Sequence, residues 1–382
     1  MTESCYLDHH SASCPHVRAV EQMASFFQMH WGAMHAPHKR GQEVHALYQS
    51  ALSVLLDHLG ANDADHFHFC HSGAEAINAV LHSHYFDFIR ETGKNHILTT
   101  NIEEAAVLSS LKRLEKLGCK EKVVSVNARC QITKEILIEH LGERTSLFSL
   151  SWANGLTGVI HPIADLIEAC HERGVRIHVD VSTVLGKLFF RFSDLPVDYI
   201  TFEGQLIHAP QGTGGLLVKS GVHFSPLITG ANTIFAPGVA ALSVAFQENE
   251  RYFDHLNLET VRLRDKFEHA ISSQILNAVV FFQHVERLPN CCAIAFPGVH
   301  AEALLYLLNR RGVYATLGGG QCQTLAHVLI ATGIDPLLAQ CALSFSLSYE
   351  TTEAEIDYAI NTVIECVNQL KRASIHLLEE ST

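Results

Sequence analysis

Two spacings of hydrophobic residues alternate along most of this chain. Short runs of β-branched and apolar residues predict strands, and apolar residues three or four positions apart predict helices. Two helices are predicted first, over 15–32 and 43–59. Strands are then predicted over 66–69, 96–99, 122–126, 145–151, 175–180 and 199–202, with helices over 74–86, 103–117, 133–140 and 163–173. This alternation is typical of the α/β class and predicts a mainly parallel, doubly wound sheet with helices on both faces.

The pattern changes in the last third of the chain. A long helical stretch, predicted over 240–256 and 260–273, is followed from Val279 by shorter strand-helix-strand units. Because 382 residues is long for a single hydrophobic core, we expect more than one domain. The predicted division is an N-terminal segment over 1–14, a large domain over 15–250 and a smaller α+β C-terminal domain over 251–382. A closing helix is predicted to begin at Thr351-Thr352-Glu353-Ala354-Glu355, which has the capping-box pattern.

Polar residues and glycine turns follow several of the predicted strands. Asp180 ends one strand, Asn154 comes just after another, and Ser72-Gly73 separates a strand from a helix. The strand at 199–202 leads into a loop that contains Leu206. In open α/β sheets, ligands bind at the carboxyl ends of the strands. We therefore expect these residues to gather at one edge of the sheet, around a functional site.

Charge and composition exclude several classes of partner. The formal net charge is −13, which argues against nucleic acid because a phosphate backbone needs clustered Lys and Arg. No apolar run reaches membrane-spanning length and the N-terminus has no secretion-signal pattern, so we expect a cytoplasmic protein without membrane contact. The 11 cysteines include no Cys-x-x-Cys pair. The pairs His66/His68 and His35/His38 lack further ligands at zinc-site spacing, so we expect no metal site.

Five landmarks occur along the chain in a specific order. They are Tyr6-Leu7-Asp8; Gly32, His38 and Gly41; Ala153-Asn154 with Gly158 and Pro162-Ile163; Asp180 with Val184-Leu185-Gly186-Lys187; and Phe296-Pro297-Gly298-Val299 with Glu302-Ala303-Leu304-Leu305. Together they resemble the cysteine desulfurases of the class V aminotransferase family, which are fold type I enzymes that use pyridoxal phosphate (PLP). The resemblance covers nearly the whole chain, from about Tyr6 to Leu370.

The resemblance implies a cofactor site and a quaternary structure. It implies PLP as cofactor and a homodimer with its active sites at the subunit interface. It places five residues at a PLP pocket, namely Gly73, Ala74, Asn154, Asp180 and Thr183. Cys322 matches the family's persulfide-forming cysteine, although no Lys or Arg lies near it in sequence to activate its thiol. Asp180 and Asn154 fit a purely structural role in a turn equally well.

The chain departs from the family where the cofactor is covalently held. The family's Ser-x-His-Lys segment reads Glu203-Gly204-Gln205-Leu206 here. Leucine cannot form an imine, so covalent catalysis of the usual lysine type is excluded at this position. Glu203 and Gln205 replace the residues that bind the phosphate, and a carboxylate repels a dianionic phosphate. Glu104 replaces a histidine that stacks on the cofactor ring, and Ser344 replaces the arginine that holds the substrate carboxylate.

Three hypotheses about function follow. We favour a pseudo-enzyme that holds PLP without a covalent bond or not at all, and that acts through protein contacts in sulfur or iron–sulfur metabolism. Its partner would be a second copy, an active paralogue, a scaffold or a sulfur-acceptor protein. The alternative is an active cysteine desulfurase that moves sulfur from L-cysteine to Cys322 as a persulfide. The third is a repurposed pocket in which Glu104, Asp180 and Glu203 bind a cation or an amine.

Overall fold

The computed structural model describes residues 4–230, 234–319 and 323–379, with side chains as far as residue 373. Its main layer is a seven-stranded sheet in the order β2-β8-β7-β6-β5-β3-β4. Neighbouring strands pair in parallel except at β8, which is antiparallel to both β2 and β7. The strands are β2 His66–Cys70, β3 His96–Thr100, β4 Lys120–Val124, β5 Thr145–Ser151, β6 Arg176–Asp180, β7 Tyr199–Glu203 and β8 Gly214–Val218. The predicted mainly parallel sheet is confirmed.

Helices cover both faces of this sheet because its strands are apolar on both sides. Leu98 and Phe148 belong to an apolar cluster that also contains residues of α2, α7 and α8. The preceding residues, Ile97 and Leu147, point the other way and join a cluster with α3 and α5. The helices of this part are α1 Val17–Gln28, α2 Lys39–Leu59, α3 Gly73–His84, α4 Arg90–Thr92, α5 Ala105–Glu115, α6 Lys134–Ile138 and α7 Ile163–Glu172, with shorter turns η1 Tyr85–Ile89, η2 Phe192–Asp194 and η3 Gly204–Ile207. The doubly wound arrangement is therefore confirmed as well.

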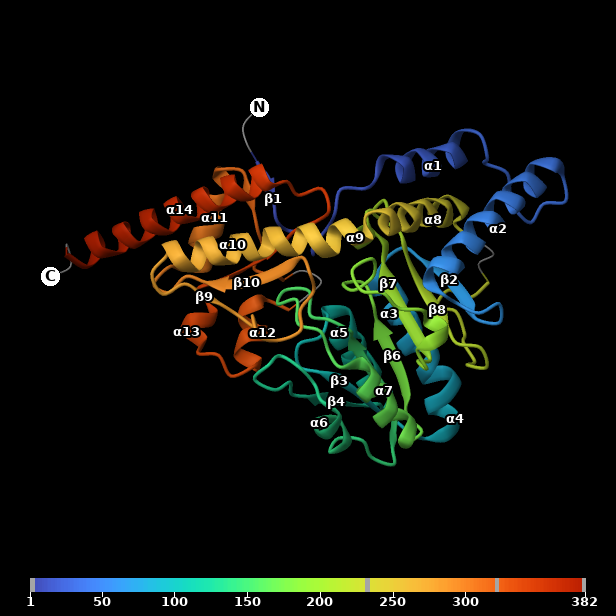
Figure 1. Cartoon of the computed structure of the whole chain (residues 1–382). Coiled ribbons are helices and arrows are strands. Elements are labelled where there is room, and N and C mark those ends of the chain that lie inside the picture. Colours follow the sequence, from blue (N-terminus) through green and yellow to red (C-terminus); the bar gives the residue numbers. More distant parts are fainter. Residues whose placement is uncertain (1–3, 231–233, 320–322, 380–382) are drawn as a thin grey trace.

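A long run of helices joins the two ends of the molecule. It consists of α8 Ala236–Arg251, α9 Phe253–His255, η4 Leu256–Thr260 and α10 Val261–Gln274. Figure 1 shows α8 beside α1 and α2, and α10 extending to the opposite end, beside α14. The break predicted between residues 256 and 260 is a π-helical turn, so the chain stays helical there.

The C-terminal part is built on a smaller sheet, β12-β10-β9, whose strands are antiparallel. A two-stranded parallel pair, β1 with β11, ties the N-terminal segment to this part. Its elements are β1 Cys5–Tyr6, β9 Val279–Val280, β10 Cys291–Ala295, α11 Ala301–Arg310, β11 Val313–Tyr314, α12 Leu325–Ala331, α13 Pro336–Ala339, β12 Ala342–Ser346 and α14 Glu353–Glu379. Leu288 and Cys291 pack into the core of the large sheet, so the domain boundary at residue 250 stays a prediction.

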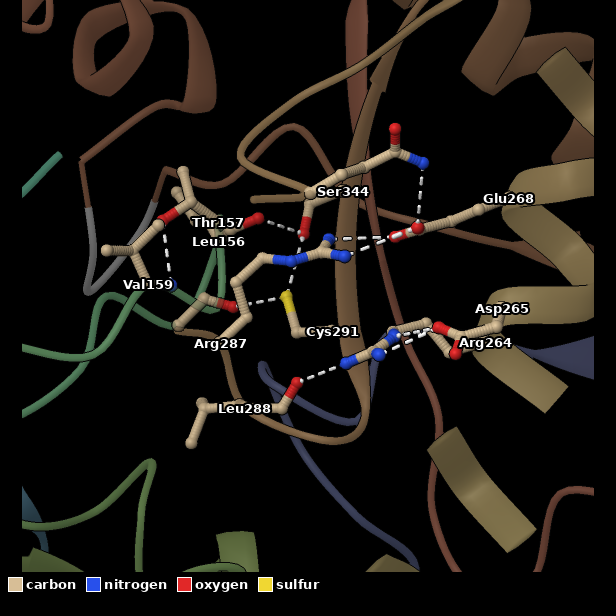
Figure 2. Close-up of polar contacts among 12 residues, drawn as sticks. Leu156, Thr157, Val159, Arg264, Asp265, Glu268, Arg287, Leu288, Cys291 and Ser344 are labelled. Atoms are coloured by element: carbon tan, nitrogen blue, oxygen red, sulfur yellow. Dashed lines mark hydrogen bonds and ion pairs between the residues drawn. The ribbon is translucent and has the colours of Figure 1, made fainter. Parts of the chain in front are cut away.

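Buried polar contacts hold the small sheet against the loop that follows β5. Arg287 and Glu268 form an ion pair of 2.8 Å in which each side chain is 5% exposed. Ser344 on β12 donates a hydrogen bond of 2.7 Å from its hydroxyl to the carbonyl oxygen of Leu156. Figure 2 shows these contacts side by side between α10 and the loop. The Ser344 bond ties this loop to β12, and the loop lies next to the candidate site.

Candidate functional site

A cavity of about 610 Å³ lies beside the carboxyl ends of β6 and β7. Its wall combines the starts of α3 and α5, the turns after β6 and β7, and part of the N-terminal segment. Its lining residues include His10, Gly73, Ala74, Glu104, Asp180, Ser182, Thr183, Glu203 and Leu206. We call this cavity the acidic pocket, because Glu104, Asp180 and Glu203 contribute carboxylates to it.

Asp180 is the last residue of β6 and is only 4% exposed. One carboxylate oxygen accepts a hydrogen bond of 2.7 Å from the Thr201 hydroxyl, and the other accepts one of 3.1 Å from the backbone N–H of Ser182. Burial raises the pKa of Asp180 above its usual value, and these hydrogen bonds oppose that shift. Asp180 is thus held in place by protein donors at the edge of the pocket.

Glu203 is the last residue of β7 and is 8% exposed. Its backbone N–H donates to the Ser182 hydroxyl at 2.9 Å. Its carboxylate reaches the start of α3, where Oε2 accepts a hydrogen bond of 2.7 Å from the backbone N–H of Gly73. Burial first, and the charge of Asp180 second, raise the pKa of Glu203 to about 7, although the Gly73 hydrogen bond lowers it.

Glu103 and Glu104 precede α5 and point to different surroundings. Glu103 is buried and accepts hydrogen bonds from the Thr100 hydroxyl and from both the N–H and the hydroxyl of Ser151. Glu104 lines the acidic pocket. Burial, followed by the charges of Asp180, Glu103 and Glu203, raises the pKa of Glu104 to about 8. A shift with three carboxylates among its causes shows that these groups repel one another when ionised.

Leu206 follows on the short turn η3 and is 9% exposed. Its side chain lines the acidic pocket next to Gln205. Among the described residues that line this pocket there is no lysine, and the arginine that lines it, Arg113, is an exposed residue. The pocket wall therefore offers carboxylates and an aliphatic side chain, but no amine.

Lys187 lines a second space together with Leu206. A small space of about 10 Å³ is lined by both residues and also by His9, His208, Asn249 and Asn290. Burial lowers the pKa of Lys187 to about 8. Lys187 does not line the acidic pocket, whereas Leu206 lines both spaces.

The structure brings four of the predicted pocket residues together, namely Gly73, Ala74, Asp180 and Thr183. Asn154 lines a different, smaller space. Its side-chain oxygen accepts hydrogen bonds from the backbone N–H groups of Leu156 and Thr157, which is the pattern of a turn residue. Cys322 lies outside the described residues, whereas Gly319, close to it in sequence, lines the acidic pocket.

His10 is a pocket residue that the sequence analysis missed. It is the second residue after the Tyr6-Leu7-Asp8 landmark and lines both the acidic pocket and the space around Asn154. The His10 ring packs so closely on Gly155 that a Cβ atom there would overlap it. Burial, followed by the charge of Lys187, lowers the pKa of His10 to about 4. No local pattern in the sequence indicated this residue, because the N-terminal segment is placed by its pairing with β11.

Within residues 4–230, 234–319 and 323–379, no group of three or more His, Cys, Asp or Glu side chains is arranged to hold a metal ion. Over the same residues, no helix has the length and apolar character that crossing a bilayer requires.

Comparison with known proteins decides the family. The family described as Aminotransferase class-V matches residues 5–359. The chain belongs to the class V aminotransferase family. Within that family it is similar to the cysteine desulfurase of Gluconacetobacter diazotrophicus, with 31% identity over 97% of this chain and 94% of that protein. It is 29% identical to the cysteine desulfurase NifS of Azotobacter vinelandii, over the same shares of each chain.

Solved structures of the family have the same fold. A NifS-like protein aligns with a TM-score of 0.89 and 28% identity, over 96% of this chain and 99% of that one. The apo structure of a cysteine desulfurase from Thermococcus onnurineus NA1 aligns with a TM-score of 0.83 over 96% and 95% of the two chains, but its 17% identity shows the fold alone. The resemblance seen in the sequence and the fold type I architecture are both confirmed.

The pocket of this chain does not fit PLP as the family resemblance places it. That cofactor carries a phosphate group, and an anion of this kind binds well to free N–H groups at a helix N-terminus. The Gly73 N–H at the start of α3 is already bonded to the Glu203 carboxylate. Asp180 adds further negative charge, Glu104 does so once the pH exceeds its raised pKa of about 8, and no lysine faces the pocket among its described lining residues. We therefore derive no step of a reaction through this cofactor.

Proposed function

We propose that this chain is a pseudo-enzyme of the cysteine desulfurase type, which acts through protein contacts in sulfur or iron–sulfur metabolism. One observation carries the proposal. Leu206 lines the pocket at the position where the resemblance places the Schiff-base lysine. An aliphatic side chain supplies neither a nucleophile nor a proton carrier. Lys187 lines a separate space and does not line the pocket.

Electrostatics support the same proposal. When Glu104, Asp180 and Glu203 on its wall are ionised, the pocket repels a dianionic phosphate. For one such carboxylate several Å away, the repulsion is on the order of a few kcal/mol at an intermediate effective dielectric constant. We propose that PLP is not bound covalently and that its phosphate finds no stable position in this pocket.

Exposed aromatic side chains support a role in protein contacts. Phe27 on α1 is 59% exposed and Trp31, just after that helix, is 68% exposed. The Phe27 ring lies 6.2 Å from that of Phe235, next to the exposed Ile234. Exposed apolar groups that lie together mark interaction sites on many proteins. We propose that this surface pairs two copies of the chain, or one copy with an active paralogue, while scaffold and sulfur-acceptor proteins remain further candidates. A cytoplasmic location also stays a prediction.

One alternative function has an observation in its favour. The pocket keeps a volume of about 610 Å³, and Gly319, near Cys322 in sequence, lines it. An active cysteine desulfurase would transfer sulfur from L-cysteine to Cys322 as a persulfide. That activity needs an amine in the pocket, or PLP held without a covalent bond.

Absorbance spectra with and without added PLP test the proposal. We expect the spectrum of the free cofactor alone, with no band of covalently bound cofactor, and no sulfide release from L-cysteine at high protein concentration. Sulfide release that requires PLP and is lost in Cys322→Ala would establish the alternative. An active family member assayed in parallel serves as the positive control.

A further inference from the structure

The protein supplies its own anion at the start of α3. Glu203 and Gly73 are 130 residues apart in sequence, yet the Glu203 carboxylate accepts the Gly73 N–H at 2.7 Å. The two residues pack closely, because a Cβ atom at residue 73 would lie 3.3 Å from the Glu203 Cβ and 3.4 Å from its Oε2. The contact is therefore a close fit between the end of β7 and the first residue of a twelve-residue helix.

Two other N–H groups near this helix start are paired within the chain. The Ser72 hydroxyl accepts the N–H of Glu75 at 3.1 Å, and the Glu75 carboxylate accepts the N–H of His71 at 2.7 Å. These two bonds form a local cap that faces the helix itself. The Gly73 N–H is different because both Gly73 and its acceptor Glu203 line the acidic pocket, whereas Glu75 does not.

We propose that Glu203 is a built-in anion that occupies the anion-binding position at the start of α3 and so excludes phosphate and other anionic ligands from the acidic pocket. The inference rests on the proposed function, since it explains why a pocket of this fold does not accept the cofactor's phosphate. It names the residue responsible and the charge of the ligands that are rejected.

Two effects of Glu203 act together and can be separated. The carboxylate uses the hydrogen-bond donor that an incoming anion needs, and its negative charge, close to Asp180 and Glu104, repels that anion. Glu203→Ser removes both effects. Glu203→Gln removes the charge but keeps an oxygen that accepts the Gly73 N–H.

Calorimetric titration with inorganic phosphate at pH 8 tests the inference. We expect Glu203→Ser to bind phosphate at least about tenfold more tightly than the native protein, by removal of one nearby charge and release of one donor. Glu203→Gln should gain less than Glu203→Ser. A folded Glu203→Ser protein with unchanged affinity would overturn the inference, as would a Glu203→Gln protein that binds as tightly as Glu203→Ser.

A matched control is available on the same helix. Glu75→Gln also removes a carboxylate from the first turn of α3, but one that bonds to His71 and does not line the pocket. It should leave phosphate affinity unchanged, and an equal gain in this variant would show a general charge effect and contradict the role of Glu203.

A second measurement does not depend on a stable serine variant. In the native protein, the backbone amide resonance of Gly73 should shift as Glu203 titrates, and this shift should be absent in Glu203→Gln. A Gly73 resonance that behaves alike in both proteins would contradict the contact. Phosphate, rather than PLP, separates the two proposals: covalent cofactor binding by the native protein refutes the proposed function, whereas unchanged phosphate affinity in Glu203→Ser refutes only the inference.

Discussion

Leu206 is shared by the acidic pocket and by the small space that Lys187 lines. Its side chain lines both the pocket and the small space that contains Lys187, whereas Lys187 lines only the latter. The molecule thus keeps an amine of lowered pKa near the site, but the side chain that lines the acidic pocket is the aliphatic Leu206. This relationship distinguishes the chain from a protein that has simply lost all amines around its pocket.

Substitutions at Leu206 report the charge of the pocket. An ammonium at this position would face Glu104, Asp180 and Glu203, whereas another carboxylate would be repelled by them. We expect Leu206→Lys to be more stable than Leu206→Glu by on the order of 2 kcal/mol in low salt at pH 8. Urea unfolding measures the difference, and Leu206→Met provides a neutral side chain of similar volume. Equal stability of the Lys and Glu variants would show that the pocket is not acidic.

Glu104 makes stability depend on pH in a predictable direction. Its pKa in the folded protein is about 8, above the ordinary value of 4.5. A raised pKa means that the contribution to stability is fully present below about pH 4.5 and is lost as the pH rises through about 8. Relative to Glu104→Gln, the native protein should therefore lose at least about 1 kcal/mol between pH 5 and pH 9. The control is Glu115→Gln, at an exposed position at the end of α5, the helix that Glu104 precedes. A difference between native and Glu104→Gln proteins that stays constant with pH would refute the shift.

In the buried ion pair of Arg287 and Glu268 (Figure 2), loss of one partner should cost more stability than loss of both. Arg287→Met leaves the Glu268 carboxylate buried without its cation, and we expect a loss of about 3–5 kcal/mol in the free energy of unfolding. The double variant with Glu268→Leu should recover much of this loss, because no charge then remains unpaired. A double variant that is less stable than Arg287→Met alone would contradict this explanation.

The exposed aromatic surface predicts the site of self-association. Phe27→Asp places a charge at the exposed surface of α1, beside Phe235. If two copies pair there, sedimentation should show a dimer for the native protein and a shift to monomer for the variant. Tyr306→Asp, at a similarly exposed aromatic residue on α11 in the C-terminal part, should stay dimeric. A dimer unaffected by Phe27→Asp would place the interface elsewhere.

Much of the fold follows from local patterns. The strand predicted over residues 145–151 has those bounds in the structure, and the helix predicted over 163–173 is α7, Ile163–Glu172. The capping box before α14 forms as expected, with Thr352 and Glu355 bonded to each other's backbone N–H groups. These elements were predictable because their signals lie within a few neighbouring residues.

Boundaries shift where the local pattern is ambiguous. The edge strand β4 begins at Lys120, two residues before the predicted start at 122, because the charged run Lys120-Glu121-Lys122 hides its alternation. Lys120 is nevertheless fixed by a hydrogen bond from its N–H to the Asn95 carbonyl. The π-helical turns at 85–89 and 256–260 likewise have no sequence signal that we recognised.

The candidate site, too, could be predicted only in part. Strand order and family resemblance place Asp180, Glu203 and Leu206 at one edge of the sheet. The bond between Glu203 and Gly73 could not be predicted, because it joins two elements through tertiary packing. His10 was missed for the same reason, since the N-terminal segment reaches the pocket only by pairing with the small sheet.

Covalent trapping tests the central claim most directly. The native protein is incubated with PLP, reduced with borohydride and digested, and its lysine-containing peptides are analysed by mass spectrometry, with an active family member as the positive control. We predict no stoichiometric pyridoxyl adduct on Lys187 or any other lysine of this chain, because Leu206 occupies the position of the reactive amine. A stoichiometric adduct on one lysine of the native protein would contradict the account.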